Sequence, residues 1–347
     1  MTNPMIPEKD LPEAFLKKIL PALAACRTDG TFTGRDGAKL RYAVFSPERP
    51  VRTLVLLHGF TESIEKYHEL CYYFLLAGFR VYVPDQRGHG FSARALPDLT
   101  LTHIDRFETY VSDFSAFMET VRAGAVGEIC LFAHSMGGAV GALYLSGHPG
   151  VFARAFLSSP MVAPKSAVPR FLGKAILGGA VLLGKGEKRV FFSKPYAGSE
   201  RFEDSSKTSR ARFDEYEKIK ETTPEFQNNG PTYRWALESL RVRRLILKKG
   251  APERVKIPVF LAVAGRDGTV ARAPQLALAA RYPAGRVKIY PGAKHEIYGS
   301  ADATFSEYLS DLLCFLTAGN AENNTAGNAE NNTAGESRQP EKETEHE

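Results

Sequence analysis

Residues 128–145 read EICLFAHSMGGAVGALYL, and they join a short apolar strand to a helix-forming run through a turn of small residues. Ser135 stands in the turn, between EICLFA and GGAVGALYL. So sharp a turn brings together the residues two before and two after the serine. Only small side chains fit there, and Ala133 and Gly137 meet that requirement. This strand–turn–helix predicts a nucleophilic serine exposed at the end of a parallel sheet.

Short strands alternate with helical segments on both sides of this stretch. The further predicted strands are FTGRDGAKLRYAVFSP (32–47), TLVLLHG (53–59), FRVYVPD (79–85), ARAFLSSP (153–160), IPVFLAVAG (257–265) and RVKIYPG (286–292). Helical patterns lie at 67–77, 110–124 and 137–149. Short runs that are almost wholly apolar are buried on both faces of a parallel sheet. Their alternation with helices predicts a mostly parallel, doubly wound α/β sheet.

The alternation stops between residues 161 and 250, where the chain becomes basic and helical in character. We expect a helical cap there, inserted into a sheet domain formed by residues 1–160 and 251–317. Residues 318–347 differ again, because the octapeptide TAGNAENN begins at Thr317 and repeats at Thr325. A repeat without large apolar residues cannot bury enough surface to offset its ordering entropy, so this tail is predicted to be disordered.

A serine hydroxyl is a weak nucleophile and needs a histidine base, which a carboxylate must orient. In sheets of this kind the chain order is serine, then acid, then histidine. Asp267 follows the strand 257–265, and His295 follows the last strand. Both therefore lie beyond carboxyl ends of strands, where open parallel sheets bind their ligands. The sequence predicts Ser135 as nucleophile, Asp267 as acid and His295 as base.

Other histidines and carboxylates fit these roles less well. His58, His89 and His134 precede Asp267 and would break the chain order, so we expect them to brace loops, and His68 and His103 have no supporting context. Among the carboxylates, Asp85 follows a strand too early in the chain, and Asp113 lies in a helical pattern. The tetrahedral oxyanion of the reaction needs backbone N–H donors. These are expected from Met136, directly after the nucleophile, and from Phe60 in the loop HGFTES.

The net charge of +6 is unevenly distributed. Residues 161–250 hold 19 Lys and Arg against 10 Asp and Glu, whereas the tail is acidic. No helix-turn-helix, zinc or aromatic-strand pattern accompanies the basic residues, which argues against nucleic acid and favours an anionic lipid surface. Four scattered cysteines without metal-ligand spacing indicate reduced thiols and no metal site. No signal-peptide pattern or membrane span is recognisable, so we expect a cytoplasmic protein, peripheral on the inner membrane face.

The cap contains VPRFLGKAILGGAVLLG, residues 168–184, which is too short and interrupted to cross a bilayer. One interpretation is a buried cap helix. The other is a mobile lid that contacts lipid through basic and apolar side chains. The candidates for that contact are Arg170, Phe171, Lys174, Lys185, Lys188 and Arg189.

Four motifs carry a resemblance to a known family: HGFTES (58–63), PDQRGHGFS (84–92), HIDRFETYVSDF (103–114) and AHSMGGAV (133–140). Together they resemble bacterial lysophospholipases of the monoacylglycerol-lipase branch of α/β hydrolases. The resemblance spans about residues 32–315 and fades in the cap. It implies the α/β-hydrolase fold. It also implies a catalytic triad on Ser135, Asp267 and His295, with oxyanion donors on Phe60 and Met136.

We therefore expect a serine hydrolase that cleaves a single-chain lipid ester without any cofactor. The first substrate class is a lysophospholipid, which would give a fatty acid and a glycerophospho-alcohol. A monoacylglycerol lipase, a general carboxylesterase and a peroxidase-type side activity remain alternatives. A non-catalytic binding protein on this scaffold would lack one of the three residues, and dehalogenases and epoxide hydrolases carry Asp where this chain has Ser135.

Overall fold

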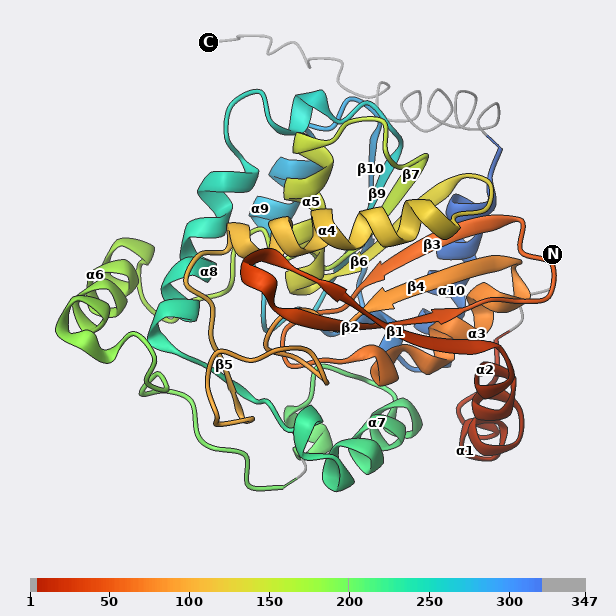
Figure 1. Cartoon of the computed structure of the whole chain (residues 1–347), viewed down its shortest axis with the longest axis horizontal. Coiled ribbons are helices and arrows are strands. Elements are labelled where there is room, and N and C mark those ends of the chain that lie inside the picture. Colours follow the sequence, from red (N-terminus) through yellow and green to blue (C-terminus); the bar gives the residue numbers. More distant parts are fainter. Residues whose placement is uncertain (1–4, 199, 320–347) are drawn as a thin grey trace, which may run out of the picture. The chain divides into compact units, whose positions relative to one another are not determined.

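The computed structural model describes residues 5–198 and 200–319. Within these residues an eight-stranded sheet has the order β1-β2-β4-β3-β6-β7-β9-β10 (Figure 1). β2 is antiparallel to both β1 and β4, and the other neighbouring pairs are parallel. The strands are Arg27–Thr33 (β1), Lys39–Phe45 (β2), Arg52–Leu57 (β3), Phe79–Pro84 (β4), Ile129–His134 (β6), Arg154–Ser158 (β7), Val259–Ala264 (β9) and Gly285–Tyr290 (β10). The predicted α/β-hydrolase sheet, mostly parallel and doubly wound, is confirmed.

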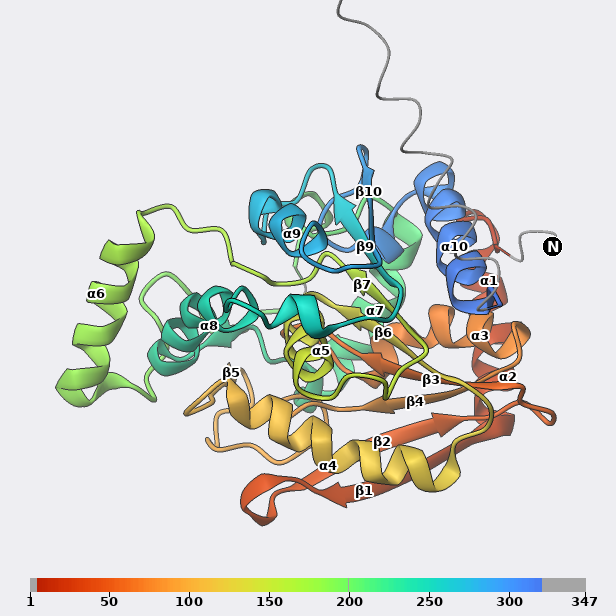
Figure 2. The same ribbon diagram turned by 90° about the horizontal axis from the view of Figure 1, so that it is seen from above.

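Helices cover both faces of this sheet, as Figure 2 shows. One face carries α4, α5, α8 and α9, and the opposite face carries α1, α2, α3 and α10. Their bounds are Leu11–Ala14 (α1), Leu20–Cys26 (α2), His68–Leu76 (α3), Glu108–Gly124 (α4), Ser135–Gly147 (α5), Tyr233–Ile246 (α8), Arg272–Ala279 (α9) and Asp302–Thr317 (α10). A π-helical turn, Phe15–Ile19, joins α1 to α2. No helix was predicted for residues 11–26.

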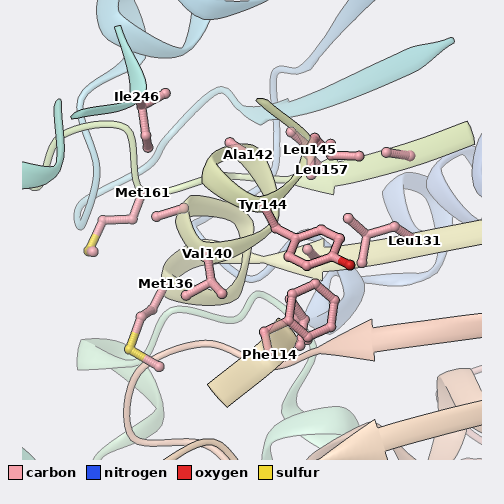
Figure 3. Packing of buried hydrophobic residues seen from close by; sticks show 14 of the residues in the cluster. Phe114, Leu131, Met136, Val140, Ala142, Tyr144, Leu145, Leu157, Met161 and Ile246 are labelled. Carbon is pink, nitrogen blue, oxygen red and sulfur yellow. The ribbon is translucent and has the colours of Figure 1, made fainter. Parts of the chain in front are cut away.

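Side chains of the central strands alternate between two hydrophobic cores, one on each face. In β3, Val55 and Leu57 belong to the core under α4 and α5, whereas Leu54 and Leu56 belong to the core under α3 and α10. All four are fully buried. Figure 3 shows the first core, in which α5 packs its apolar side chains between the sheet and neighbouring helices. This two-sided burial explains why the strands read as continuous apolar runs.

Residues 161–250, assigned by the sequence to a cap, contain α6 (Arg170–Ala180), α7 (Arg210–Thr222) and α8. The segment leaves the sheet after β7 and returns at β9, and these two strands are hydrogen-bonded neighbours. α8 packs on the core, while α6 lies farther out and packs on α8 through Leu177 and Leu240 (Figures 1 and 2). A short parallel pair, β5 (Leu101–Thr102) and β8 (Gly230–Pro231), joins the segment to the loop after β4.

Two features of the described residues limit the kinds of site available. No described helix is long and apolar enough to cross a bilayer. Nor do these residues contain a group of three or more His, Cys, Asp or Glu side chains placed to hold a metal ion. The octapeptide repeat, predicted to be disordered, lies outside the described residues from residue 320 onward.

Candidate active site

The turn from β6 into α5 places Ser135 in a strained backbone conformation. Its φ is +50°, in the left-handed region that costs a residue other than glycine of order 1–3 kcal/mol. Gly137 lies against the end of β3, where a Cβ would be 2.4 Å from the carbonyl oxygen of Leu57. Glycine is therefore required at this position. Surrounding packing holds the turn in place, since Met136, Ala139 and Val140 of the same helix are fully buried (Figure 3).

The structure brings Ser135, His295 and Asp267 into one hydrogen-bonded chain. His295 Nε2 lies 2.8 Å from Ser135 Oγ, and His295 Nδ1 lies 2.8 Å from Asp267 Oδ2. The other carboxylate oxygen, Asp267 Oδ1, accepts from the backbone N–H groups of Thr269 at 2.8 Å and Val270 at 2.9 Å. These bonds fix the carboxylate, so its free oxygen faces the imidazole.

The electrostatics of the chain suit a base oriented by a charged acid. Burial alone would raise the pKa of Asp267, but hydrogen bonding and attraction to His295 and the two backbone donors lower it below its usual value. The carboxylate is thus ionised at neutral pH and accepts a hydrogen bond from the Nδ1–H of His295. Nε2 is then left as the acceptor that faces the serine hydroxyl. This arrangement can activate Ser135 for attack on a carbonyl carbon.

The two amides expected to stabilise an oxyanion belong to the residue after the serine and to the loop after β3. Met136 is the second residue of α5, so its N–H has no acceptor within the helix, and its side chain is buried in the core. Phe60 follows β3, lines the same cavity as Ser135, and its ring lies 4.0 Å from that of Trp235 between centroids. Their role as oxyanion donors stays a prediction.

A buried polar network that the sequence analysis did not identify supports the loop HGFTES. The Glu62 carboxylate accepts from Gly59 N–H, from Tyr67 Oη at 2.6 Å and from Tyr298 Oη at 2.8 Å. It also accepts from Lys66 Nζ at 2.9 Å. Burial would raise the pKa of Glu62, yet Lys66 and these donors hold it well below its usual value. The sequence offered one signal for Glu62, its place in the loop HGFTES, which also holds the expected oxyanion donor Phe60.

Apart from His68, whose Nδ1 has no hydrogen-bond partner among the described residues, the competing histidines and carboxylates form hydrogen bonds that link segments of the chain. His58 Nε2 lies 2.9 Å from Gln86 N, and His134 Nδ1 lies 3.1 Å from the Ser158 carbonyl. Each ring links its loop to a neighbouring segment. Further contacts of this kind join His89 to Arg87, His103 to Thr232, Asp85 to Ile64 and Phe91, and Asp113 to Arg87.

Two cavities of opposite character share one lining residue, Phe192. The first, about 890 Å³, is lined by Ser135, His295 and many charged side chains. The second, about 560 Å³, lies between α6 and α8 and is lined mainly by apolar groups, including Trp235 and Leu240. Phe192 lines both cavities. Hereafter they are called the polar chamber and the apolar chamber.

Most of the lipid-contact candidates lie on the outer surface of the 161–250 segment. Phe171, Lys174, Lys185 and Lys188 are exposed, and Leu182 and Leu183 beside them are 89% and 77% exposed. The interpretation of residues 168–184 as a buried helix is therefore wrong. Arg170 is half-buried and donates to the Leu240 carbonyl. It also lines an outer groove whose other basic residues are Lys174, Arg243, Arg244 and Lys248.

Arg189, also a candidate for lipid contact, does not lie on the outer surface of the segment. Its side chain is 14% exposed and points into the structure. The guanidinium donates to Thr100 Oγ1 and to Asn229 Oδ1, the latter at 3.3 Å. Arg189 therefore ties the segment to the loop before β5 and does not face outward.

Proteins of known function resemble this chain. A profile of the family described as "Serine aminopeptidase, S33" matches residues 48–302. "Lysophospholipase L2" of Escherichia coli (strain K12) is 32% identical over 310 residues, covering 85% of this chain and 89% of that protein. "Monoacylglycerol lipase" of Mycolicibacterium smegmatis is 31% identical over 163 residues, covering 44% of this chain and 56% of that protein.

The fold is shared with solved structures of lower sequence identity. A soluble variant of monoglyceride lipase from Saccharomyces cerevisiae, in complex with a substrate analogue, superposes with a TM-score of 0.65 at 20% identity. The alignment covers 82% of this chain and 92% of that one. At this identity the likeness describes the fold alone.

Proposed function

The chain belongs to the serine aminopeptidase S33 family of α/β hydrolases, and from this premise we propose that it hydrolyses the ester of a single-chain lipid. The substrate proposed first is a lysophospholipid, with a free fatty acid and a glycerophospho-alcohol as products. One observation carries the proposal: the hydrogen-bonded chain Ser135–His295–Asp267 opens into the polar chamber. Similarity to lysophospholipase L2 over 85% of the chain supports the substrate class.

The reaction follows from the positions of the three side chains. His295 Nε2 takes the proton of Ser135 Oγ as that oxygen attacks the ester carbonyl. The backbone N–H groups of Phe60 and Met136 would stabilise the oxyanion. His295 then gives its proton to the leaving alcohol, which frees the glycerophospho-alcohol and leaves the fatty acyl group on Ser135. Water, activated by His295, repeats the sequence on this acyl-enzyme and releases the fatty acid.

The pair of chambers supports an amphiphilic substrate. The apolar chamber is suited to an acyl chain, whose burial contributes about 0.8 kcal/mol for each methylene. The polar chamber, which holds Ser135 and His295, is suited to a hydrated head group. We propose that a lipid with its ester at Ser135 extends past Phe192, which lines both chambers, and places one end in each. Such a lipid has one acyl chain and one polar end.

A monoacylglycerol remains the second candidate substrate, because the similarity to a monoacylglycerol lipase covers 44% of the chain. The outer surface of α6 also supports contact with an anionic lipid surface. It carries exposed apolar side chains, such as Phe171, and the turn after α6 adds Leu182. The basic groove beside α6 is lined by Arg243 and Lys248. We propose that the protein binds the membrane surface peripherally through this face.

Two measurements test the proposed function. A fluorophosphonate probe should label the wild-type protein and not Ser135→Ala. A hydrolysis panel should then compare lysophospholipids, monoacylglycerols and p-nitrophenyl esters of graded chain length. We expect the highest kcat/KM with a long-chain lysophospholipid. Labelling that survives Ser135→Ala would place the nucleophile elsewhere. A clear preference for short esters would favour a general carboxylesterase.

A further inference from the structure

The charged side chains of the polar chamber are mostly paired with one another. Glu62 and Glu296 both lie within 2.9 Å of Lys66 Nζ. Arg201 lies 2.7 Å from Asp204, and Lys220 lies 3.8 Å from Glu217. Each of these cations therefore has a carboxylate partner, although Glu217 Oε2 accepts no hydrogen bond among the described residues. Lys207 is a lining cation that is only weakly compensated.

Lys207 is buried, with an exposed fraction of 6%. Within the described residues, its Nζ makes a hydrogen bond of 2.9 Å to the Arg212 carbonyl and lies 3.9 Å from Glu296 Oε2. That carboxylate is already bound by Lys66 at 2.8 Å and by Tyr298 Oη at 3.2 Å. An ammonium carries three N–H donors, so Lys207 has donor capacity left over beside the chamber.

Burying a charge with so little compensation is costly, and the cost shows in the titration of the group. Burial lowers the pKa of Lys207 to about 8, despite attraction to Glu296. The nearby cation Lys66 adds to the lowering. An anion bound in the chamber would supply the missing compensation.

The position of Lys207 is fixed relative to the catalytic histidine. The Glu296 N–H, next to His295, donates to the Ser206 carbonyl at 3.0 Å. The stem of Lys207 packs against Gly299, where a Cβ would lie 2.5 Å from Lys207 Cγ. The backbone on both sides of the lysine is therefore tied to the segment that carries the base.

We propose that Lys207 is the anion anchor of the polar chamber and binds the phosphodiester of the substrate head group while the ester carbonyl lies at Ser135. This inference rests on the proposed function and makes it more specific. Lysine binds phosphate as a compact point charge. A monoacylglycerol has no phosphate, so the anchor would discriminate between the two candidate lipids without taking part in the chemical step.

The first test compares two substrates with the same acyl chain, oleoyl lysophosphatidylethanolamine and monooleoylglycerol. Lys207→Met keeps most of the side-chain volume and removes the charge. We expect it to lower kcat/KM for the lysophospholipid by about 10-fold to 100-fold, as for loss of a charged hydrogen bond. Its kcat/KM for monooleoylglycerol should stay within about threefold of the wild-type value. Lys207→Arg should keep part of the preference for the lysophospholipid. The control Lys256→Met, at an exposed site before β9, should leave kcat/KM unchanged for both substrates.

The second test does not depend on lipid hydrolysis. Glycerophosphoethanolamine and inorganic phosphate are used as inhibitors of p-nitrophenyl butyrate turnover. We expect competitive inhibition of the wild type, stronger for the diester, and at least tenfold weaker inhibition of Lys207→Met. Stronger inhibition by inorganic phosphate than by the diester would instead assign the site to free phosphate and overturn the head-group anchor.

The two tests separate failure of the anchor from failure of the proposed function. Equal losses of Lys207→Met on both lipids, or unchanged inhibition by the diester, would overturn the anchor. A third outcome is that the wild type does not hydrolyse lysophospholipids, while the diester inhibits the wild type and no longer inhibits Lys207→Met. That outcome would support the anchor and contradict the proposed substrate. Thermal unfolding of each variant shows whether a uniform loss of activity reflects loss of folding.

Discussion

Backbone strain and side-chain orientation act together at the reacting serine. Ser135 adopts a φ of +50°, and the hydroxyl it presents already lies 2.8 Å from the base. Asp267 is oriented in turn by two backbone donors, at 2.8 and 2.9 Å. The three groups are therefore positioned before substrate binds. The proposed catalysis would then depend on single atoms, each of which a conservative substitution can remove.

Replacement of Asp267 by asparagine gives the sharpest test of this dependence. The amide removes the ionised acceptor for His295 Nδ1 and favours the wrong tautomer of the imidazole. Asp267→Asn should therefore lower kcat on p-nitrophenyl butyrate by about 10³-fold to 10⁴-fold. Asp105→Asn, at a side chain 85% exposed, serves as the matched control. Turnover of Asp267→Asn within tenfold of wild type would mean that another carboxylate is the acid.

The titration of Lys207 predicts a pH-dependent substrate preference. Its pKa is lowered to about 8, so the ammonium is present below that pH and is lost as the pH rises through it. A phosphodiester stays anionic throughout. The ratio of kcat/KM for lysophospholipid to that for monoacylglycerol should thus be constant near pH 6–7 and fall between about pH 8 and 9. The charged and titratable groups that face this ammonium are Glu62, Lys66, Tyr216, Glu217 and Glu296.

The preference should be measured across pH 6 to 9.5 in wild type and in Lys207→Arg. Because guanidinium does not deprotonate in this range, the variant should show a flat ratio. A wild-type ratio independent of pH would argue against an ammonium at the head group. A ratio that falls equally in both proteins would have the same meaning.

At the level of residues, the sequence allowed a prediction of those site residues that belong to a local motif. Ser135, Asp267 and His295 each follow a recognisable strand, and chain order selects among the histidines. Lys207 and Glu62 could not be identified in this way. Lys207 reaches the site only because the 161–250 segment returns over the sheet beside Gly299. Arg189 was misread because nothing local shows that its partner is Thr100, 89 residues earlier in the chain.

Among the elements, α6 differs most from its neighbours. α7 is fixed to the core by Arg212, which contacts Glu69 at 3.1 Å and the Ser300 carbonyl at 3.1 Å. α6 has only Gly173 and Leu177 buried along its length. Its contacts are with α8, and its outer face carries Phe171 and Leu172, 77% and 41% exposed. Helices covered this sparsely are the ones that open locally at low free-energy cost.

This face predicts membrane binding that depends on salt. Each basic residue near an anionic surface contributes on the order of 1 kcal/mol, screened over roughly 8–10 Å at physiological salt. Binding to vesicles with anionic lipid should weaken as salt rises, and Lys174→Gln/Lys185→Gln/Lys188→Gln should mimic high salt. Hydrolysis of a short soluble ester should stay nearly constant in both cases.

The measurement is vesicle co-sedimentation across a salt series, run beside the soluble-ester assay. The charge-matched control replaces three exposed lysines elsewhere, Lys17, Lys18 and Lys39, with glutamine. Leu182→Ser/Leu183→Ser should weaken binding at all salt concentrations, because these side chains supply the apolar contact. Binding that does not respond to salt, or equal weakening by the control, would contradict the lipid-surface interpretation.

Elements were predictable where burial makes a simple pattern. β3, β6 and β9 each pair with a strand on both sides and are buried on both faces of the sheet, so their apolar runs are continuous. Most of β1 (RTDGTFT) was not predicted as a strand, because it lies at the edge of the sheet and its residues are largely exposed and polar. The stretch 32–47 is in fact the end of β1, a turn at Asp36 with φ of +66°, and β2. Residues 11–26 were missed because Pro12 and Pro21 interrupt the helical pattern.

For the molecule as a whole, buried neutral histidines predict a loss of stability in mild acid. Burial lowers the pKa of His68 and of His134 to about 4, from an ordinary value of 6.5. Between these values the unfolded chain binds protons that the folded chain excludes. The free energy of unfolding should therefore fall as the pH drops from about 6.5 to 4, by on the order of 3 kcal/mol for each group.

His68→Phe provides the control for this prediction. The ring lies 6.3 Å from those of both Phe15 and Phe45, and its Nδ1 has no hydrogen-bond partner among the described residues. Urea unfolding, followed by the fluorescence of the single tryptophan, Trp235, should show a shallower pH dependence in the variant. An identical dependence in the two proteins would mean that His68 titrates normally.

The place where the 161–250 segment joins the sheet has a consequence for how such enzymes diversify. β7 and β9 are adjacent strands, so the segment departs from and rejoins the scaffold at neighbouring positions. Its length and sequence can drift without disturbing the register of any strand, and the three residues proposed to break the bond, Ser135, Asp267 and His295, are encoded outside it. The anchor Lys207 and the wall residue Phe192 are encoded within it. Grafting this segment from one relative onto the scaffold of another should therefore transfer substrate preference as a module, with the reaction itself left intact.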